Sequence, residues 1–446
     1  MSALLTFIKK RLEYRRNQRL DRSELERLKL KKFRQLVSYV NLHSPYYQDI
    51  IRQRNIDPNN CHPTDFPVLN KKTLMENFDD IVTDRRINRQ TIKEFLLGSK
   101  DPNNLLFDHY RIVHTSGSSG EVGYFVYSPE EWAVGSSQAN RSKYGPRPPR
   151  QFVGRIRVVF YGATEGHFTG MSVISSIRKS PARFIMNIKT LEINHPLPQT
   201  IDTLNQFQPH IMFGYPGALK ILANKQQSGE LSIKPIALST GGESLSKADW
   251  QILNQAFHCN VLNVYGCSEH LMMGIADLGN EQMYLFDDDL IYEINPDHTL
   301  ITNLFNYTLP LIRYYMSDVL HLQEDMSLAK PYLLIKSLVG RNEVVPRFIN
   351  DEGQEDFISP HTINEIFVPG VNRFQMQLVD EKQFTFKACL DATLAAAQQE
   401  TAVEQLQERL KEILAQKKMT QVQFDVRVVD EIPLNPRSRK FQLIVE

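Results

Sequence analysis

A loop of hydroxyl side chains and glycines is the strongest chemical signal in this chain of 446 residues. Residues 114–120 read His-Thr-Ser-Gly-Ser-Ser-Gly. Glycine lets backbone N–H groups approach an anion, and the hydroxyls add further hydrogen-bond donors. The composition indicates a phosphate-binding loop, although taken alone it also fits an ordinary turn. The loop is not a Walker P-loop, because no Gly-Lys-Ser/Thr sequence ends it. Its candidate ligands are Thr115, Ser116, Gly117, Ser118, Ser119 and Gly120.

Two further polar clusters directly follow predicted strands. A carboxylate at a strand end beside a phosphate loop has the chemistry to hold Mg²⁺, and a tyrosine there can stack on a nucleotide base. Each cluster taken singly also fits a polar turn. The first cluster is Gly241, Gly242 and Glu243, and the second is Tyr265, Gly266, Ser268 and Glu269.

Three shorter signals lie nearer the C-terminus. Asp318 follows the segment Pro-Leu-Ile-Arg-Tyr at 310–314, and an aspartate can accept hydrogen bonds from both hydroxyls of a ribose. Arg341 follows a glycine where the sequence pattern changes. Lys440 ends the segment Pro-Arg-Ser-Arg-Lys, where the alternative is an ordinary solvated surface charge.

The elements that must position these residues alternate between strand and helix patterns. Such alternation is typical of a parallel α/β sheet, and ligands bind just beyond the carboxyl ends of parallel strands. The polar clusters are therefore expected to share one edge of a sheet. The predicted strands are 155–162, 211–213, 235–240 and 260–264, and the predicted helices are 218–227 and the segment capped by Ser246 and Asp249.

A second, smaller unit is predicted after residue 343. We expect a large α/β domain over 1–343 and a small, mobile α+β domain over 344–446, joined by a hinge at 340–343. The small domain is expected to contain strands at 373–379, 383–390 and 422–429 and a helix capped by Thr401 and Glu404.

Composition excludes several classes of protein. Apolar residues at 41% and charged residues at 23% are ordinary for a soluble globular chain. The 52 basic and 51 acidic residues argue against a nucleic-acid-binding protein. Four cysteines without a Cys-x-x-Cys pair argue against a disulfide scaffold or a zinc ribbon. This cysteine usage suits a reducing cytoplasm, where we expect the protein to be. No apolar run is long enough to span a membrane.

The N-terminal segment, residues 1–22, has a short apolar start followed by Lys9, Lys10 and Arg11. This order is the reverse of a signal peptide. We expect a packed or solvated surface helix, and the alternative is a basic amphipathic helix in peripheral contact with a membrane. The next helix is predicted to begin with a capping box of Ser23 and Glu26.

In this order and spacing, the six signals resemble the adenylate-forming (AMP-dependent synthetase and ligase) superfamily, and within it the phenylacetate–coenzyme A ligase family and its capsule-biosynthesis relatives. The resemblance covers nearly the whole chain. It includes the opening segments Ser-Pro-Tyr-Tyr at 44–47 and Phe-Pro-Val-Leu at 66–69, with Lys71 and Lys72 after them. It implies that residues 115–120 grip the phosphates of ATP.

The resemblance also implies roles for the other signals. Residues 241–243 and Tyr265 would line the adenine and acid sites, and Glu269 would bind Mg²⁺. Asp318 would hold the ribose, with Arg341 assisting beside the hinge. Lys440 would bridge the carboxylate, the α-phosphate and the ribose during adenylation.

Two positions depart from the family pattern. Glu121 and Val122 stand where the phosphate loop usually continues with lysine and proline, and a carboxylate beside a triphosphate is repulsive unless it is screened. Arg439 stands where a glycine usually precedes the terminal lysine. These departures motivate one alternative hypothesis, that the chain is a non-catalytic relative with the same fold.

The resemblance implies an AMP-forming acid–thiol ligase that uses ATP, Mg²⁺ and coenzyme A. An aryl or arylacetic acid would bind near Tyr161, Phe168 and Tyr215, although aromatic residues at strand ends also commonly belong to the core. The alternative acceptor of the acyl group is an amine or a carrier protein. The basic, proline-containing segment 141–155 either contacts the phosphates of coenzyme A or forms a solvated loop.

Overall fold

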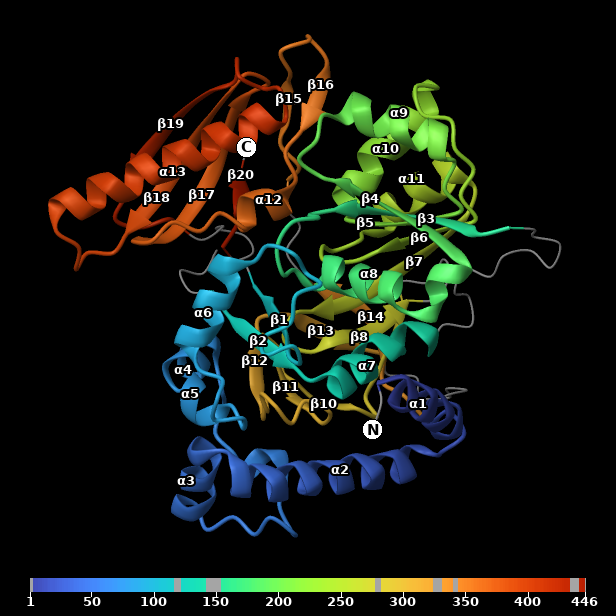
Figure 1. The fold of residues 1–446 in the computed structure, drawn as a ribbon, viewed down its shortest axis with the longest axis vertical. Helices are drawn as coiled ribbons and strands as arrows, with labels where there is room; N and C mark the ends of the chain where they lie inside the picture. The colour runs from blue at the N-terminus through green and yellow to red at the C-terminus, as the bar shows by residue number, and fades with distance from the viewer. Residues whose placement is uncertain are drawn as a thin grey trace.

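A computed structural model describes residues 3–115, 122–141, 154–276, 282–323, 331–339, 344–433 and 441–445. Its centre is a nine-stranded sheet in the order β13-β14-β9-β8-β7-β6-β5-β3-β4 (Figure 1). One half is parallel, made of β4 (Met186–Glu192), β3 (Ile156–Gly162), β5 (Ile211–Gly214), β6 (Ala237–Thr240) and β7 (Asn260–Cys267). The other half is antiparallel, made of β8 (Leu271–Ala276), β9 (Met283–Leu285), β14 (Leu334–Val339) and β13 (Val319–Leu322). The four strands predicted for the large domain are confirmed as parallel strands.

Helices cover both faces of the parallel half. On one face, α9 (Leu197–Phe207), α10 (Pro216–Ser228) and α11 (Lys247–Phe257) enclose an apolar core with the strands. On the other face, α8 (Thr169–Lys179) packs its apolar side on Phe160. The predicted cap of α11 is confirmed, because the Ser246 side chain accepts a hydrogen bond from the backbone N–H of Asp249. Strand β7 continues through Cys267, so the prediction that it ends before Tyr265 is wrong.

Six helices form the N-terminal part of the chain. They are α1 (Ala3–Asn17), α2 (Arg22–His43), α3 (Pro45–Gln53), α4 (Lys71–Glu76), α5 (Phe78–Ile81) and α6 (Arg89–Gly98). The capping box of α2 is formed by Asp21 and Glu24 rather than by Ser23 and Glu26. The same side-chain chemistry is available two residues earlier, and it starts the helix there.

The remaining elements of the large unit pack beneath the central sheet (Figure 1). They are the hairpin β1 (Arg111–His114) and β2 (Tyr124–Tyr127), α7 (Pro129–Ser137), and a sheet of β10 (Leu290–Ile294), β11 (Thr299–Asn303) and β12 (Tyr314–Met316). Short 3₁₀ turns lie at Pro63–Asp65, Gln138–Arg141 and Pro181–Phe184.

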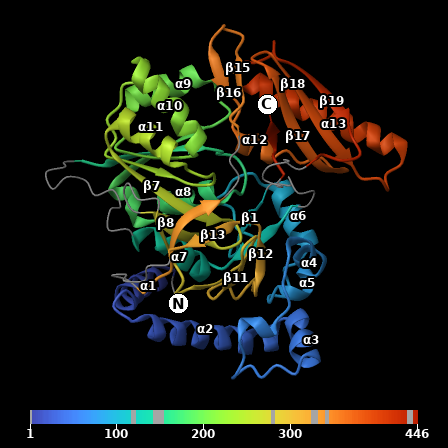
Figure 2. The same ribbon diagram turned by 180° about the vertical axis from the view of Figure 1, so that it is seen from behind.

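The C-terminal part forms a separate α+β layer at one end of the molecule (Figure 2). A sheet in the order β19-β18-β17-β20 packs with α13 around an apolar core. The predicted cap of α13 at Thr401 is wrong, because the helix begins at Ala396. The elements are β15 (Arg347–Ile349), β16 (Glu355–Phe357), α12 (Pro360–Asn364), β17 (Val371–Asp380), β18 (Gln383–Leu390), α13 (Ala396–Gln416), β19 (Gln423–Val428) and β20 (Ile444–Val445).

The predicted hinge at 340–343 lies outside the described residues, and the domain boundary there stays a prediction. A buried ion pair of Lys417 and Asp356 at 3.0 Å lies within the C-terminal part, and both of its side chains also contact the large unit. Lys417 also donates to the carbonyl oxygen of His195, and Asp356 accepts from the backbone N–H of Leu197. Within the described ranges, none of the helices is long and apolar enough to cross a membrane.

Candidate active site

The base of the predicted phosphate loop is held by the hairpin β1–β2. The backbone N–H of Thr115 donates to the carbonyl oxygen of Gly123 at 2.9 Å. The backbone N–H of Gly123 in turn donates to the Thr115 hydroxyl at 3.1 Å. These bonds join Thr115 to Gly123 at the base of the loop. Ser116, Gly117, Ser118, Ser119 and Gly120 lie outside the described residues, and their roles stay predictions.

Ser268 joins this loop to the end of β7. Its hydroxyl donates to the carbonyl oxygen of His114 and lies 2.9 Å from the hydroxyl of Thr169. Its own carbonyl oxygen accepts a hydrogen bond from the Tyr127 hydroxyl at 2.7 Å. Two predicted site segments, 154 positions apart in the chain, are therefore in direct contact.

Glu269 follows Ser268 and is only 8% exposed. Burial raises the pKa of its carboxyl, whereas its backbone and Cys267 hydrogen bonds and the charge of Lys71 lower that pKa. A side chain added at Gly123 would lie 3.1 Å from both the Lys71 side chain and the Thr115 hydroxyl. The geometry thus brings a lysine, a buried carboxylate and the loop base together. In the sequence, Lys71 belongs to the family resemblance only, because a lysine at the start of a short helix does not by itself indicate a site.

The predicted ribose ligand is already oriented by a second predicted residue. The Tyr265 hydroxyl donates to Oδ2 of Asp318 at 2.8 Å. Burial and the Asp318 charge raise the pKa of Tyr265 well above its usual range, so the phenol keeps its proton and remains a donor. The Asp318 carbonyl oxygen accepts from Thr299 on β11 at 2.9 Å, which fixes the backbone. Tyr265 therefore positions the carboxylate.

The segment after β6 forms a tight turn against the first turn of α10. Gly242 has φ of +81°, and a side chain there would lie 3.1 Å from the Tyr215 ring. Glu243 accepts a hydrogen bond from the backbone N–H of Gly217 at 3.0 Å, which places its negative charge at a helix N-terminus. The Cβ position of Gly241 lies 3.4 Å from the carbonyl oxygen of Val264, so this turn also contacts β7.

An aromatic cluster lies beside this turn. Phe168 packs on His114, with ring centroids 4.6 Å apart, and Tyr215 packs on His361 of α12 at 4.6 Å. The His361 ring also lies 5.7 Å from Phe168, so these rings form one group. The C-terminal layer thus contributes a ring that packs on two residues of the predicted acid site. Sequence reasoning missed His361, because α12 is short and the contact joins distant segments.

His361 has a charged partner at the C-cap of its own short helix. Nε2 of His361 forms an ion pair with the carboxylate of Glu365, one turn further along the chain. Burial opposes a charge on this imidazole, but the Glu365 carboxylate outweighs burial and raises the pKa of His361. This imidazole and its carboxylate partner lie beside two aromatic rings of the predicted acid site.

The positions of two predicted site residues, Tyr161 and Gly266, are explained by packing. Tyr161 is fully buried in the core beneath α9 and α10, so the structure places it in the core rather than in the acid pocket. Gly266 lies at an irregularity in the β7–β8 pairing, where a Cβ atom would be 2.6 Å from the carbonyl oxygen of Leu271. That close approach accounts for glycine there without a ligand. Arg341 and Lys440 lie outside the described residues.

The predicted magnesium ligand has no cluster of protein ligands around it. Within the described part of the chain, no group of three or more His, Cys, Asp or Glu residues has the arrangement of a metal site. Mg²⁺ that is bound with a nucleotide usually takes one or two protein carboxylates and completes its shell with phosphate and water oxygens. The single buried carboxylate of Glu269, beside the loop base, fits that mode of binding.

Comparison with known proteins gives two relatives by sequence. No protein-family model matches the chain. The chain is 22% identical to Protein CapK of Staphylococcus aureus over 334 residues, which are 72% of this chain and 68% of that protein. A segment of 122 residues is 30% identical to indoleacetate–lysine synthetase of Pseudomonas savastanoi, and it covers 26% of this chain and 31% of that enzyme.

Solved structures resemble the chain over nearly its full length. A 2-hydroxyisobutyryl-CoA ligase in its thioesterification state, with 2-HIB-AMP and CoA, superposes with a TM-score of 0.62 at 16% identity, covering 96% of this chain and 91% of that one. An open conformation of the same ligase gives a TM-score of 0.58 at 13% identity, covering 97% and 93%. These likenesses establish the fold, a large α/β unit followed by a smaller C-terminal unit.

Proposed function

We propose that this chain, which has the fold of the adenylate-forming ligases, is an AMP-forming carboxylic acid ligase. It activates an acid with ATP to an acyl-adenylate and passes the acyl group to coenzyme A or another thiol. The observation that carries this proposal is the convergence of five predicted residues from three segments beside the end of β7. Tyr265, Ser268 and Glu269 belong to one segment; Tyr265 contacts Asp318, and Ser268 contacts His114, the neighbour of Thr115.

The first half-reaction needs positioning more than proton transfer. A carboxylate oxygen of the acid attacks the α-phosphorus of ATP, the bond to the β-phosphate oxygen breaks, and pyrophosphate leaves with that electron pair. Neither reactant has to gain or lose a proton, so the protein contributes alignment and charge neutralisation. Mg²⁺ bound with the nucleotide would offset charge on the phosphates.

The residues of the site divide these tasks. The loop based on Thr115 holds phosphate oxygens, and Asp318, oriented by Tyr265, accepts the ribose hydroxyls. Glu269 is the carboxylate available to the metal ion. Lys440 supplies a cation at the α-phosphate, and Arg341 assists at the hinge, as the resemblance implies. Lys71 lies near Glu269 and adds a second cation near the phosphate loop.

The acid pocket is formed by Phe168, Tyr215 and His361. The two aromatic rings favour a flat aryl or arylacetic acid, and the ring of His361 packs against both of them. Because His361 belongs to the C-terminal layer, a rotation of that layer would open the pocket to the acceptor. The segment 142–153, the core of the predicted coenzyme A contact, lies outside the described residues.

A second candidate function differs only in the acceptor. Indoleacetate–lysine synthetase, by its name, joins an arylacetic acid to an amine, and it shares 30% identity with a segment of this chain. That similarity favours an amine acceptor as the alternative to coenzyme A. The four cysteines are free thiols, which supports the cytoplasm as the proposed compartment.

The deciding experiment compares the two half-reactions with each acceptor. Acyl-adenylate formation is followed by exchange of labelled pyrophosphate into ATP with one acid at a time, without an acceptor. Coenzyme A and lysine are then added separately, and product is identified by mass spectrometry. Product with coenzyme A supports the thiol ligase, and product with lysine alone supports the amine ligase. A protein that binds ATP but exchanges no pyrophosphate with any acid would support the non-catalytic alternative.

A further inference from the structure

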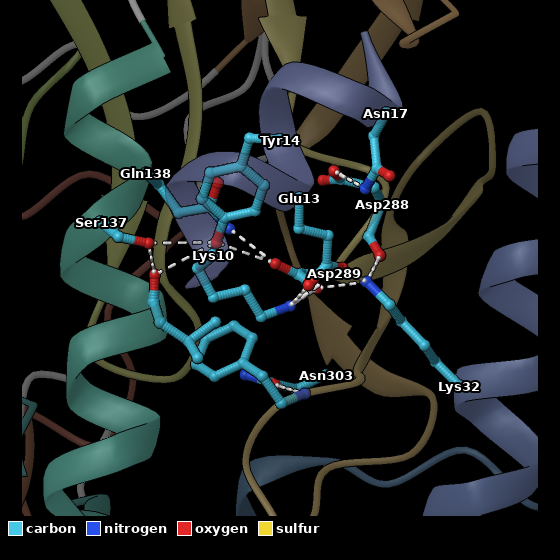
Figure 3. A network of polar contacts seen from close by, with 12 residues as sticks. Lys10, Glu13, Tyr14, Asn17, Lys32, Ser137, Gln138, Asp288, Asp289 and Asn303 are labelled. Carbon is cyan, nitrogen blue, oxygen red and sulfur yellow. Dashed lines mark hydrogen bonds and ion pairs between the residues drawn. The ribbon is translucent and has the colours of Figure 1, made fainter. Parts of the chain in front are cut away.

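The first helix, α1, packs on the protein with its polar face inward (Figure 3). Lys10 lies 2.8 Å from the carboxylate of Asp289, and the Tyr14 hydroxyl donates to the same carboxylate at 3.0 Å. Asn17 donates to Asp288 at 2.8 Å, and both carboxylates are nearly inaccessible to solvent. The side chains that fix α1 in place are therefore of the kind that normally faces water.

The outer face of α1 carries the apolar side chains. At 100° per residue, positions separated by four lie along one strip of a helix, so Leu4, Ile8 and Leu12 form a continuous row with Leu5 beside it. These four side chains are 47–60% exposed. A single exposed leucine is ordinary, but an exposed row on a helix whose polar side is buried reverses the usual arrangement.

The same outer face carries positive charge. Five cationic side chains surround the apolar row, and all five residues are exposed. Glu13 is the one acidic residue within Ala3–Asn17, and it is turned inward to pair with Lys10 and Lys32. The cations of the outer face are Lys9, Arg11, Arg15 and Arg16 on α1 and Arg19 just after it.

Positive charge is also concentrated in the surrounding region. Residues 3–34 contain twelve Lys and Arg but four Asp and Glu, in a chain whose totals are 52 and 51, so the rest of the chain is net negative. The neighbouring helix α2 adds a groove of about 600 Å³ lined in part by Arg27, Lys31 and Arg34. Both helices lie at the end of the molecule opposite the C-terminal sheet (Figures 1 and 2).

We propose that the outer face of α1 binds the surface of an anionic phospholipid membrane. The apolar row enters the boundary between headgroups and acyl chains, and the flanking cations contact lipid phosphates, which is the arrangement of an interfacial helix. The surface does not suit a symmetric contact between two copies of the chain, because such a contact would press five cations against five cations. The ion pairs with Asp289 hold the helix in the orientation that presents this face.

Vesicle flotation of the full chain tests the proposal. The vesicles contain phosphatidylcholine alone or phosphatidylcholine mixed with phosphatidylglycerol. One variant, Ile8→Ser with Leu12→Ser, removes half of the apolar row, and a second, Arg15→Gln with Arg16→Gln, removes two cations. The matched control is Leu42→Ser with Leu97→Ser, which changes two leucines that are 71% and 88% exposed elsewhere on the molecule.

The wild-type chain is expected to float with the anionic vesicles, and added salt should weaken that binding. Each pair of substitutions should lower the affinity for anionic vesicles at least about tenfold, since each surface cation is worth roughly a fivefold change in affinity and each apolar side chain loses its transfer from water. The control should bind normally. Unaltered thermal melting of both variants would show that α1 remains in place. Absence of vesicle binding, or equal binding by wild type and both α1 variants, would overturn the proposal. If the chain self-associates without vesicles and the same variants abolish that association, the face binds a second copy of the chain instead, and the membrane proposal is overturned.

Discussion

The pair formed by Tyr265 and Asp318 gives the sharpest test of the nucleotide site. Asp318→Ala removes the carboxylate that is proposed to accept two ribose hydroxyls. Hydrogen bonds to a charged group contribute about 1.5–3 kcal/mol each. Loss of both should therefore weaken ATP binding by about 3 kcal/mol or more, which is on the order of a hundredfold in Kd.

Tyr265→Phe should have a smaller effect, because it keeps the carboxylate and removes only the hydrogen bond of 2.8 Å that orients it. A loss of about 1 kcal/mol, roughly fivefold in Kd, is expected. In the absence of Asp318 the tyrosine has nothing to orient, so Tyr265→Phe should then change ATP affinity little. The two substitutions should thus be clearly non-additive.

Isothermal calorimetry with Mg-ATP, without any acid, measures the Kd for ATP of the wild type, the two single variants and the double variant. Asp297→Ala is the control, since that aspartate has 85% side-chain exposure and pairs only with the neighbouring His298 in the described contacts. Unchanged ATP affinity in Asp318→Ala would refute the ribose assignment. Additive effects would refute the positioning role of Tyr265.

Three further predictions concern stability and the site. Lys417→Met should lower the free energy of unfolding by about 3–5 kcal/mol, because Asp356 would stay buried without its cation. Urea denaturation measures this loss, and the neighbouring exposed Lys418→Met should change the free energy of unfolding by less than about 1 kcal/mol. Similar losses in the two variants would contradict the argument. Burial lowers the pKa of His114 to about 4, below its ordinary 6.5. Between these two pH values the unfolded chain binds a proton that the folded protein does not, so the free energy of unfolding is highest above pH 6.5 and declines as the pH falls toward 4. His114→Phe should reduce the loss of stability between about pH 7 and pH 5, and an equally steep decline in the variant would contradict this. Gly242→Ala should strain a backbone with φ of +81° and displace the Tyr215 ring, raising KM for the acid; an unchanged KM would separate this turn from the pocket.

Much of the fold follows from local sequence patterns. The parallel strands and their helices were predictable because apolar periodicity and turn residues agree there, as at Ser246 and at Gly229, which ends α10 with φ of +84°. The fold that the resemblance to adenylate-forming enzymes implies is confirmed. The caps at Ser23 and Thr401 were mispredicted, because Asp21 offers the same chemistry earlier and an alanine- and glutamine-rich stretch extends α13 upstream.

The contacts between distant segments were not predictable from local patterns. Lys10 meets Asp289 across 279 positions, and His361 reaches Tyr215 from another unit of the chain. Nothing local distinguishes Lys71 from any other helix-starting lysine. Tyr161 shows the converse, because its place after a run of apolar residues fits a core position and a pocket position equally well, and the fold puts it in the core.

The measurement that tests the central claim most directly is pyrophosphate release from Mg-ATP across a panel of aryl, arylacetic, fatty and amino acids, first without an acceptor. The account predicts release with one class of acid. It further predicts that Lys440→Ala abolishes most of that release with little change in thermal stability, while the exposed Lys411→Ala is unaffected. Release that is undiminished in Lys440→Ala would contradict the role of that lysine. A wild-type protein that neither binds ATP nor releases pyrophosphate with any acid would contradict the account as a whole.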